Sequence, residues 1–247
     1  MLLDIDFSVI IPARYHSTRL PAKPLLPLHG VPMVVRTWQQ CIKAVDRDNV
    51  YVATDSEEIR SVCEEYGIQV IMTSEECMTG TDRVAEVATK INSSIFINVQ
   101  GDEPVLNPED LKKVVDISLK NPDEIINGAC LISSESQFRD FKIPKVVMNK
   151  DNKLLYMSRG PIPANKTNRF IKAWRQICIY AFPRSALEDF SNCQSKTPLE
   201  EIEDIEIIRF LELGWEVRMV ELSDQSISLD SPEDVLLIEN AIIERGL

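Results

Sequence analysis

No stretch of about 18 consecutive apolar residues occurs in this chain of 247 residues, so the sequence predicts no membrane-spanning helix. The first residues, Met1–Asp6, lack the basic start of a secretory signal peptide. Positive charge is also scarce, because 39 acidic side chains outnumber 27 basic ones and the net charge is −12. This balance argues against a protein that binds nucleic acid or an anionic membrane. We therefore expect a cytoplasmic protein that binds neither, and whose acidity is compatible with divalent cations.

Clustered metal-binding residues are missing too. The six cysteines are scattered without a CxxC pair, and the only histidines are His16 and His29. A zinc site is therefore not expected, and the thiols receive no predicted role. No GxGxxG motif follows the first predicted strand, which argues against a dinucleotide-dependent oxidoreductase.

Strand-like and helix-like segments alternate through the first half of the chain. We predict strands at 7–11, 50–53, 69–72 and 95–99, and helices at about 33–45, 57–66 and 82–91. Alternation of this kind predicts an α/β fold with a mostly parallel, doubly wound, Rossmann-like sheet. Because parallel strands end at one edge of a sheet, Asp55, Thr73 and Gln100 should meet there.

The second half of the chain has a different pattern. A turn containing Asp151 and Asn152 separates two strand-like segments, which predicts a hairpin. The further elements predicted are a strand at 175–180, helices at 185–190 and 200–213, a strand at 215–222 and a helix from Pro232. No low-complexity linker and no internal repeat interrupt the chain. We therefore predict a single domain, 1–247, with an inserted subregion at about 129–183.

The segment "IPARYHSTRLPAKPL", Ile11–Leu25, concentrates positive charge in an acidic chain. Arg14, Arg19 and Lys23 lie within ten residues of one another. Its prolines, beginning with Pro12, predict that neither strand nor helix continues. A stiff cationic loop at the end of the first strand suits a polyphosphate ligand. An ordinary solvated basic loop is the alternative.

Two segments place carboxylates at the same predicted edge. "NVQGDEP", Asn98–Pro104, ends the fourth strand with Asp102, and Gly101 would let the backbone approach a ligand closely. In "SLDSPED", Ser228–Asp234, the last four residues suit a helix start, which leaves Asp230 without a structural role. Carboxylates beside a polyphosphate are typical of a magnesium site. A polar turn and a helix cap are the alternatives.

Two further segments carry weaker signals. "MTGTDR", Met78–Arg83, could hold a base edge or an anion at a helix start, or could be an ordinary cap. In "TPLEEIEDIEIIR", Thr197–Arg209, the carboxylates Glu200, Glu203 and Glu206 would share roughly one helix face. That face is either solvated or available to substrate hydroxyls.

Together these segments resemble the CMP-Kdo synthetase family, the 3-deoxy-manno-octulosonate cytidylyltransferases. The motifs that carry the resemblance are the opening loop, "VATD", "TGTDR", "NVQGDEP" and "LDSPED", in order from about Val9 to Ile243. Related sialic-acid cytidylyltransferases open with a glycine-rich loop instead. The resemblance implies a nucleotide-diphospho-sugar transferase-like fold and a homodimer joined through the inserted hairpin region. It also implies that CTP activates Kdo for lipopolysaccharide or surface glycan synthesis, with Mg²⁺ as the cofactor.

The resemblance also implies roles for individual residues. Arg14, Arg19 and Lys23 would grip the triphosphate, and Asp102 and Asp230 would hold magnesium. The nucleotide site would comprise Pro12, Ala13, Arg14, Ser17, Arg19, Lys23, Thr73, Ser74, Gly80, Thr81, Arg83, Gln100 and Asp102. The sugar site would comprise Gln100, Arg159, Gln176, Tyr180, Glu200 and Glu203.

Two positions depart from the family pattern, and both lie on the sugar side. Gln176 stands where a histidine usually precedes "LGIYGY", and Glu201 stands where a histidine commonly follows "PLE". The acceptor could therefore be another ulosonic acid, such as an amino-octulosonate or a nonulosonate. A non-catalytic nucleotide-binding regulatory protein is the alternative from another class, and it would be expected to lack the paired carboxylates.

Overall fold

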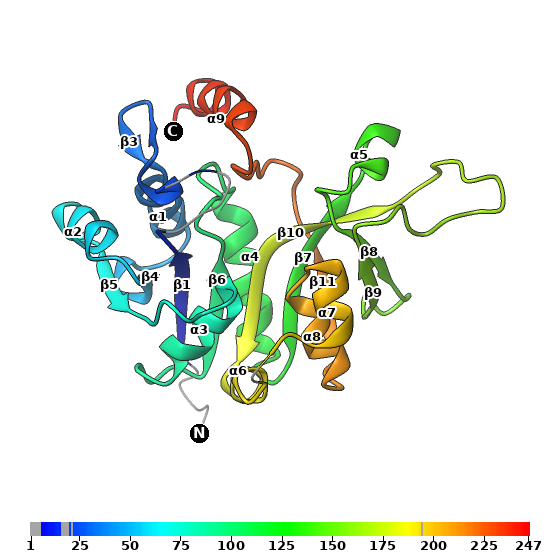
Figure 1. Cartoon of the computed structure of the whole chain (residues 1–247), viewed down its shortest axis with the longest axis horizontal. Coiled ribbons are helices and arrows are strands. Elements are labelled where there is room, and N and C mark those ends of the chain that lie inside the picture. The colour runs from blue at the N-terminus through cyan, green and yellow to red at the C-terminus, as the bar shows by residue number, and fades with distance from the viewer. Residues whose placement is uncertain (1–5, 16–19, 21, 194) are drawn as a thin grey trace.

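The computed structural model describes residues 6–15, 20, 22–193 and 195–247. Within that part of the chain, nine strands form one sheet in the order β11-β7-β10-β6-β1-β4-β5, and β8 joins β9 to β10 (Figure 1). The strands are β1 (Phe7–Ala13), β4 (Val50–Thr54), β5 (Gln69–Met72), β6 (Ile95–Val99), β7 (Ile125–Leu131), β8 (Lys145–Met148), β9 (Leu154–Ser158), β10 (Trp174–Pro183) and β11 (Val217–Glu221). β10 runs antiparallel to both of its neighbours in that order, so the sheet is mixed, although mostly parallel.

Helices cover both faces of this sheet. Strand β1 is buried on both sides because Val9 and Ile11 pack into one hydrophobic cluster and Ile10 into the other. The helices α1 (Met33–Ala44), α2 (Glu57–Glu65) and α4 (Pro108–Lys120) contribute to the first cluster. The helices α3 (Gly80–Ala88), α6 (Arg184–Ser191) and α8 (Ile207–Glu212) contribute to the second. The predicted α/β layering is therefore confirmed.

The remaining elements are η1 (Lys23–Leu25), β2 (Pro27–Leu28), β3 (Val31–Pro32), η2 (Arg47–Asn49), α5 (Glu135–Arg139), α7 (Pro198–Glu203) and α9 (Pro232–Arg245). Of these, β3 and α9 lie beyond the end of the sheet to which β1 points, and α7 lies beside α8 (Figure 1). Helix α9 packs through Ile238, Ala241 and Ile242 onto Leu28 and Met33, which brings the end of the chain beside β2 and the start of α1 (Figure 1).

Every element predicted for the first half is present, with ends shifted by at most a few residues. The predicted hairpin is confirmed, because β8 and β9 pair antiparallel. Helix α4 and strand β7 were not anticipated, although Asn107 accepts a hydrogen bond as the N-cap of α4 and Pro108 occupies its first position. Among the described residues no helix is long and apolar enough to cross a membrane.

The prediction that Pro12 ends the first strand is wrong. β1 continues to Ala13, and Pro12 pairs with Ala53 of β4. Pairing with β6 has already ended at Ile10. A residue without an N–H is tolerated here because β1 is paired on one side only.

The prediction of one helix over 200–213 is also wrong. The chain forms two short helices, α7 and α8, separated at Asp204, which adopts the left-handed conformation with φ 50°. A residue in that conformation ends a helix. The carboxylates of Glu200, Glu203 and Glu206 therefore do not share one face, and each has a different partner.

Candidate active site

A cleft of about 800 Å³ opens at the carboxyl ends of β1 and β6. Its walls include η1, the start of α3, strand β10 and the segment that enters α9. The predicted site residues that line it are Pro12, Ala13, Arg14, Lys23, Gly80, Arg83, Gln100, Asp102, Arg159, Gln176, Tyr180 and Asp230. Nucleotide-side and sugar-side candidates thus share one cleft.

Other predicted residues lie elsewhere. Those that do not line the cleft are Thr73, Ser74, Thr81, Glu200 and Glu203. Ser17 and Arg19 fall outside the described residues. The cleft also contains side chains to which the sequence assigned no role, namely Glu103, Lys142, Arg175 and Lys196.

The two carboxylates proposed from the sequence are brought together by the backbone. The N–H of Leu229 donates to the carbonyl of Asp102 at 3.0 Å, which holds the segment before Asp230 against the end of β6. Lys23 Nζ donates to Asp102 Oδ2 at 2.6 Å. The cation of the opening loop and the carboxylate of "NVQGDEP" are therefore direct partners.

The start of α9 fixes the position of Asp230. The Asp234 carboxylate accepts hydrogen bonds from the backbone N–H groups of Asp230 and Ser231, at 2.9 and 2.7 Å. Ser231 and Asp234 form the capping box of α9, so the predicted helix start is confirmed. Asp230 itself lies just before this cap, and its Oδ2 accepts a hydrogen bond from Ser228 Oγ at 3.2 Å.

The sequence suggested that Gly101 lets the backbone approach a ligand, but in the structure it lies against the backbone of Pro12. A Cβ atom at this position would lie 2.6 Å from the carbonyl oxygen of Pro12. Thr37 Oγ1 also donates to the Gly101 carbonyl at 3.1 Å. Only glycine allows the "GDEP" turn to lie this close to β1.

Glu103 is a buried carboxyl group directly behind this turn. It is 4% exposed and accepts a hydrogen bond from Ser226 Oγ. Burial, and then the nearby charge of Asp102, raise the pKa of Glu103 to about 8. Glu103 is therefore mostly uncharged at neutral pH, so it repels the carboxylates of Asp102 and Asp230 little. The only sequence feature that could have identified Glu103 is its position directly after Asp102.

The predicted meeting of strand ends is confirmed on the nucleotide side. Arg83, buried at the start of α3, donates to Asp55 Oδ2 at 2.8 Å and to Thr73 Oγ1. Asp55 Oδ1 also accepts from the backbone N–H of Tyr15, at 3.3 Å. This buried ion pair joins β4, β5, α3 and the opening loop.

The start of α3 faces Gln100 across a narrow gap. A Cβ atom on Gly80 would lie 3.0 Å from the amide atoms of Gln100 and 3.3 Å from Pro12 Cγ. Thr79 and Asp82 form a capping box, so this segment is also an ordinary helix cap, which was the alternative considered from the sequence. Thr81, which the sequence placed in the nucleotide site, donates its backbone N–H to Glu206 Oε2 at 2.8 Å.

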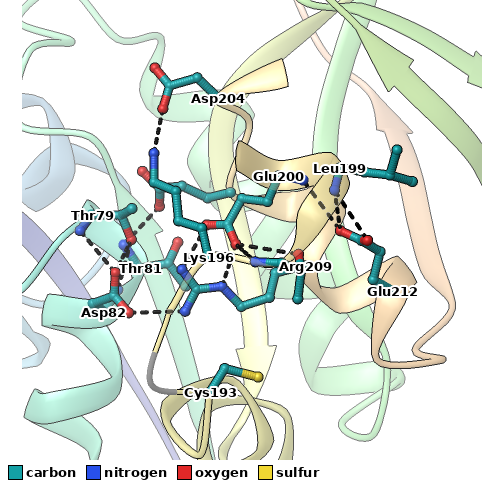
Figure 2. A network of polar contacts seen from close by, with 12 residues as sticks. Thr79, Thr81, Asp82, Cys193, Lys196, Leu199, Glu200, Asp204, Arg209 and Glu212 are labelled. Carbon is teal, nitrogen blue, oxygen red and sulfur yellow. Dashed lines mark hydrogen bonds and ion pairs between the residues drawn. The ribbon is translucent and has the colours of Figure 1, made fainter. Parts of the chain in front are cut away.

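A buried ionic network joins this helix start to α7 and α8 (Figure 2). Arg209 is completely buried and donates to both carboxylate oxygens of Glu200, at 2.6 and 2.7 Å. Its third contact is with Asp82 Oδ1 at 3.1 Å, and its guanidinium lies 3.7 Å from the ring centroid of Phe190. Glu200 therefore serves this network and does not reach the cleft.

The sugar-side residues are held by backbone contacts. Arg159 donates through Nε to the Glu203 carbonyl at 2.7 Å and through a terminal nitrogen to the Asp204 carbonyl at 2.8 Å. The Glu203 carboxylate in turn accepts from the Arg159 backbone N–H at 2.9 Å. Burial raises the pKa of Tyr180 well above its ordinary value, so its hydroxyl keeps its proton and can donate.

The cleft offers donors that suit a hard cation. Asp102 and Asp230 supply only oxygen atoms, and no group of three or more metal-ligating side chains occurs among the described residues. Magnesium prefers this kind of site, with one or two carboxylates and the remaining positions filled by water and phosphate oxygens. The residues present therefore fit magnesium that arrives with a polyphosphate.

Comparisons with known proteins agree with this geometry. Residues 8–221 match the family model described as cytidylyltransferase. A 3-deoxy-manno-octulosonate cytidylyltransferase of Nitratiruptor sp. is 37% identical over 243 residues, which cover 96% of this chain and 100% of that protein. The mitochondrial 3-deoxy-manno-octulosonate cytidylyltransferase of Arabidopsis thaliana is 35% identical over 243 residues, covering 96% and 83%.

Solved structures show the same likeness. A CMP:2-keto-3-deoxy-manno-octonic acid synthetase complexed with CTP matches with a TM-score of 0.90 and 30% identity, covering 98% of this chain and 100% of that one. A cytidylyltransferase from Leptospira borgpetersenii matches with a TM-score of 0.64 at 19% identity, covering 97% and 87%. The second likeness concerns the fold alone.

Proposed function

This chain belongs to the cytidylyltransferase family, among its 3-deoxy-manno-octulosonate cytidylyltransferases, and from that premise we propose its reaction. It transfers the cytidylyl group of CTP to 3-deoxy-manno-octulosonate (Kdo) or a close analogue. The products are the CMP-sugar and pyrophosphate.

The observation that carries this proposal is the shared cleft. Lys23 and Asp102 on its nucleotide side and Tyr180 on its sugar side line one continuous space, with Gln100 also in its lining. A transfer between two substrates needs both bound in one cavity, with the reacting atoms close together. A non-catalytic regulatory protein would not need both Asp102 and Asp230 in this cleft.

In the proposed step the anomeric hydroxyl oxygen of the sugar forms a bond to the α-phosphorus of CTP. The bond from that phosphorus to the bridging oxygen of the β-phosphate breaks, pyrophosphate leaves with the bond electrons, and the hydroxyl proton is released. Arg14 and Lys23 line the cleft where they can neutralise the departing charge. Arg19 is assigned to the same clamp by sequence alone.

We assign the magnesium site to Asp102 and Asp230. Magnesium bound there would supply positive charge to the α-phosphate and lower the pKa of the attacking hydroxyl. Lys23, now 2.6 Å from Asp102, holds this carboxylate in position before the metal and nucleotide arrive.

The two sides of the cleft recognise different parts of the substrates. The close approach of Gly80, Gln100 and Pro12 forms a narrow, polar surface suited to the edge of cytosine. Tyr180 and Gln176, with the backbone-anchored Arg159, face the other side and suit the hydroxyls and carboxylate of a sugar acid. Gln176 is the observation that favours a second candidate acceptor, an amino-substituted or otherwise modified ulosonic acid.

We further propose a cytoplasmic homodimer that supplies CMP-Kdo for lipopolysaccharide or surface glycan synthesis. The subregion 129–183 exposes Phe141, Leu155 and Ile171, at 68%, 59% and 79% of their surface. Large apolar side chains that are this exposed favour a protein contact. The hairpin of β8 and β9 and the loop that follows it carry two of the three (Figure 1).

The experiment that tests the reaction is pyrophosphate release with CTP and a panel of sugar acids. We expect turnover with Kdo or a modified octulosonate, dependence on magnesium, and a preference for CTP over UTP. Equal use of CTP and UTP would contradict the cytidylyl assignment. Preference for sialic acid over Kdo would contradict the assignment to the Kdo branch.

A further inference from the structure

Gln176 of β10 lies in the cleft wall beside a fully buried amide. Gln176 is 7% exposed, and its Nε2 donates to Oδ1 of Asn127 at 3.0 Å. Asn127, on β7, has no exposed surface. An amide side chain has one end that donates and one that accepts, so the partner at one end decides which atom remains at the other.

The orientation of Asn127 is fixed by two backbone carbonyls. Its Nδ2 donates to the carbonyl oxygens of Ile177 and Ile179, both at 3.0 Å. Both carbonyls lie at the shift in register between β10 and β7, which falls between Ile177 and Tyr180. Because a carbonyl oxygen can only accept, the nitrogen of Asn127 must face both, and Oδ1 must point away from them.

The orientation of Gln176 follows from this. Only the Gln176 nitrogen can donate to Asn127 Oδ1, since a flipped amide would place two oxygens against each other in the interior. No hydrogen bond to the Gln176 oxygen, Oε1, occurs among the described residues. Oε1 is also not one of the fully buried polar atoms that lack a partner, so it is open to the cleft that this side chain lines.

We propose that Gln176 presents Oε1 as a fixed hydrogen-bond acceptor to the bound sugar acid, so that the enzyme selects an acceptor substrate with a hydroxyl or amine facing this atom. The inference rests on the proposed function and adds the polarity that the sugar must have. Asn127 acts as a positioning residue, because it prevents the amide from flipping to suit another ligand. A sugar with no donor at that position leaves Oε1 buried and unpaired.

The test uses Kdo and analogues in which each hydroxyl other than the anomeric one is replaced in turn by fluorine or by an amine. Fluorine keeps the size but removes the donor, whereas an amine keeps a donor. In the native enzyme one fluorinated position should lower kcat/KM roughly 10- to 100-fold, while the amine at that position is accepted. Gln176→Met has no comparable acceptor. In this variant, fluorine at the same position should lower kcat/KM by no more than about threefold relative to Kdo.

Gln176→His is the matched control. One ring nitrogen can donate to Asn127 Oδ1, which leaves the other as an acceptor when the ring is neutral. At pH 8 this variant should therefore keep the position-specific loss. The melting temperature and CTP binding of both variants show whether each is folded. If Gln176→Met does not fold, the inference is judged from the kcat/KM values of the analogues with the native enzyme and with Gln176→His.

Three results would overturn the inference. The first is a native enzyme that uses Kdo and tolerates fluorine at every position, which leaves the proposed function standing. The second is the same position-specific loss in native protein and in folded Gln176→Met. The third is no pyrophosphate release with any sugar acid, which would remove the proposed function as well.

Discussion

Asp102 is already paired with a cation before any substrate binds. Lys23 Nζ and Asp102 Oδ2 are 2.6 Å apart, and both side chains are partly shielded from solvent. We expect Lys23 to move from this carboxylate to the phosphates when CTP and magnesium arrive. Exchange of one cation for another leaves Asp102 with a positively charged partner throughout, which avoids the cost of an unpaired charge in the cleft.

The carboxylates of Asp102 and Asp230 should be required for turnover but not for folding. Asp102→Asn and Asp230→Asn should each lower kcat by about 100- to 1,000-fold at saturating magnesium, because each removes charge stabilisation from the transition state. Pyrophosphate release measures the loss, and circular dichroism checks the fold. Asp116→Asn, at an exposed position of α4, is the control and should leave kcat unchanged. Near-normal turnover in either variant would remove that residue from the metal site.

Glu206 should make stability depend on pH. Burial raises its pKa above the ordinary 4.5, although the Thr81 backbone N–H opposes the shift. Between pH 4.5 and its folded pKa, the folded state holds a proton that the unfolded chain has released. The stability that Glu206 contributes is therefore fully present below about pH 4.5 and is lost as pH rises through the folded pKa.

Urea unfolding of native protein and Glu206→Gln from pH 5 to pH 8 measures this contribution. The neutral amide can still accept from Thr81 but does not titrate, so the native protein should lose stability relative to the variant as pH rises. Glu244→Gln, at an exposed position of α9, should show no such difference. A constant difference between native protein and Glu206→Gln across this range would show that Glu206 does not titrate as inferred.

At the scale of elements, the break between α7 and α8 decides which carboxylates are structural. One continuous helix would have placed Glu200, Glu203 and Glu206 along a single stripe. The left-handed Asp204 instead turns the chain, so that Glu200 meets Arg209, Glu203 meets Arg159 and Glu206 meets α3. Arg209 contacts both Glu200 and Asp82, and so ties α7 and α8 to the start of α3 (Figure 2).

Removal of Arg209 should destabilise the whole protein. Arg209→Met leaves the Glu200 carboxylate buried without its cation, which should cost about 3–5 kcal/mol of unfolding free energy. Arg60→Met is the control, because its ion pairs with Glu57 and Glu64 are exposed on α2 and screened by solvent, so their loss should change stability little. Urea unfolding at neutral pH compares the two. A cost for Arg209→Met as small as that for Arg60→Met would contradict the structural role given to the network.

At the scale of the molecule, charge and exposed apolar surface bear on assembly. A net charge of −12 makes close approach of two copies unfavourable unless apolar contact offsets the repulsion. Leu155 of β9 and its exposed neighbours in the subregion 129–183 can supply such contact. We therefore assign the proposed dimer interface to this part of the molecule.

Leu155→Glu should dissociate the dimer. The new charge would have to be desolvated at the interface, so light scattering after size-exclusion chromatography should shift from the mass of two chains toward that of one. Ile202→Glu is a matched control, since Ile202 is 78% exposed but lies on α7, outside the subregion. A dimer that survives Leu155→Glu but dissociates with Ile202→Glu would place the interface on α7 instead.

The sequence by itself determined the elements whose signals are local. Short, mostly apolar runs predicted strands at 50–53, 69–72 and 95–99, and "SPED" predicted the start of α9, because side-chain period and capping act within a few residues. The edge of the sheet at which Asp102 lies also followed, since parallel strands end together. The prediction that Pro12 would end β1 failed because it considered the proline alone and not the strands on either side.

Only the tertiary structure decided how each polar group is used. Glu103 is buried against Ser226, which lies 123 positions later in the chain, and Gln176 takes its orientation from Asn127, 49 positions earlier. Gly101 is required by the carbonyl of Pro12, and Glu200 is held by Arg209 behind the cleft. Desolvation and hydrogen-bond partners depend on segments that folding brings together, and no local pattern in the chain contains that information.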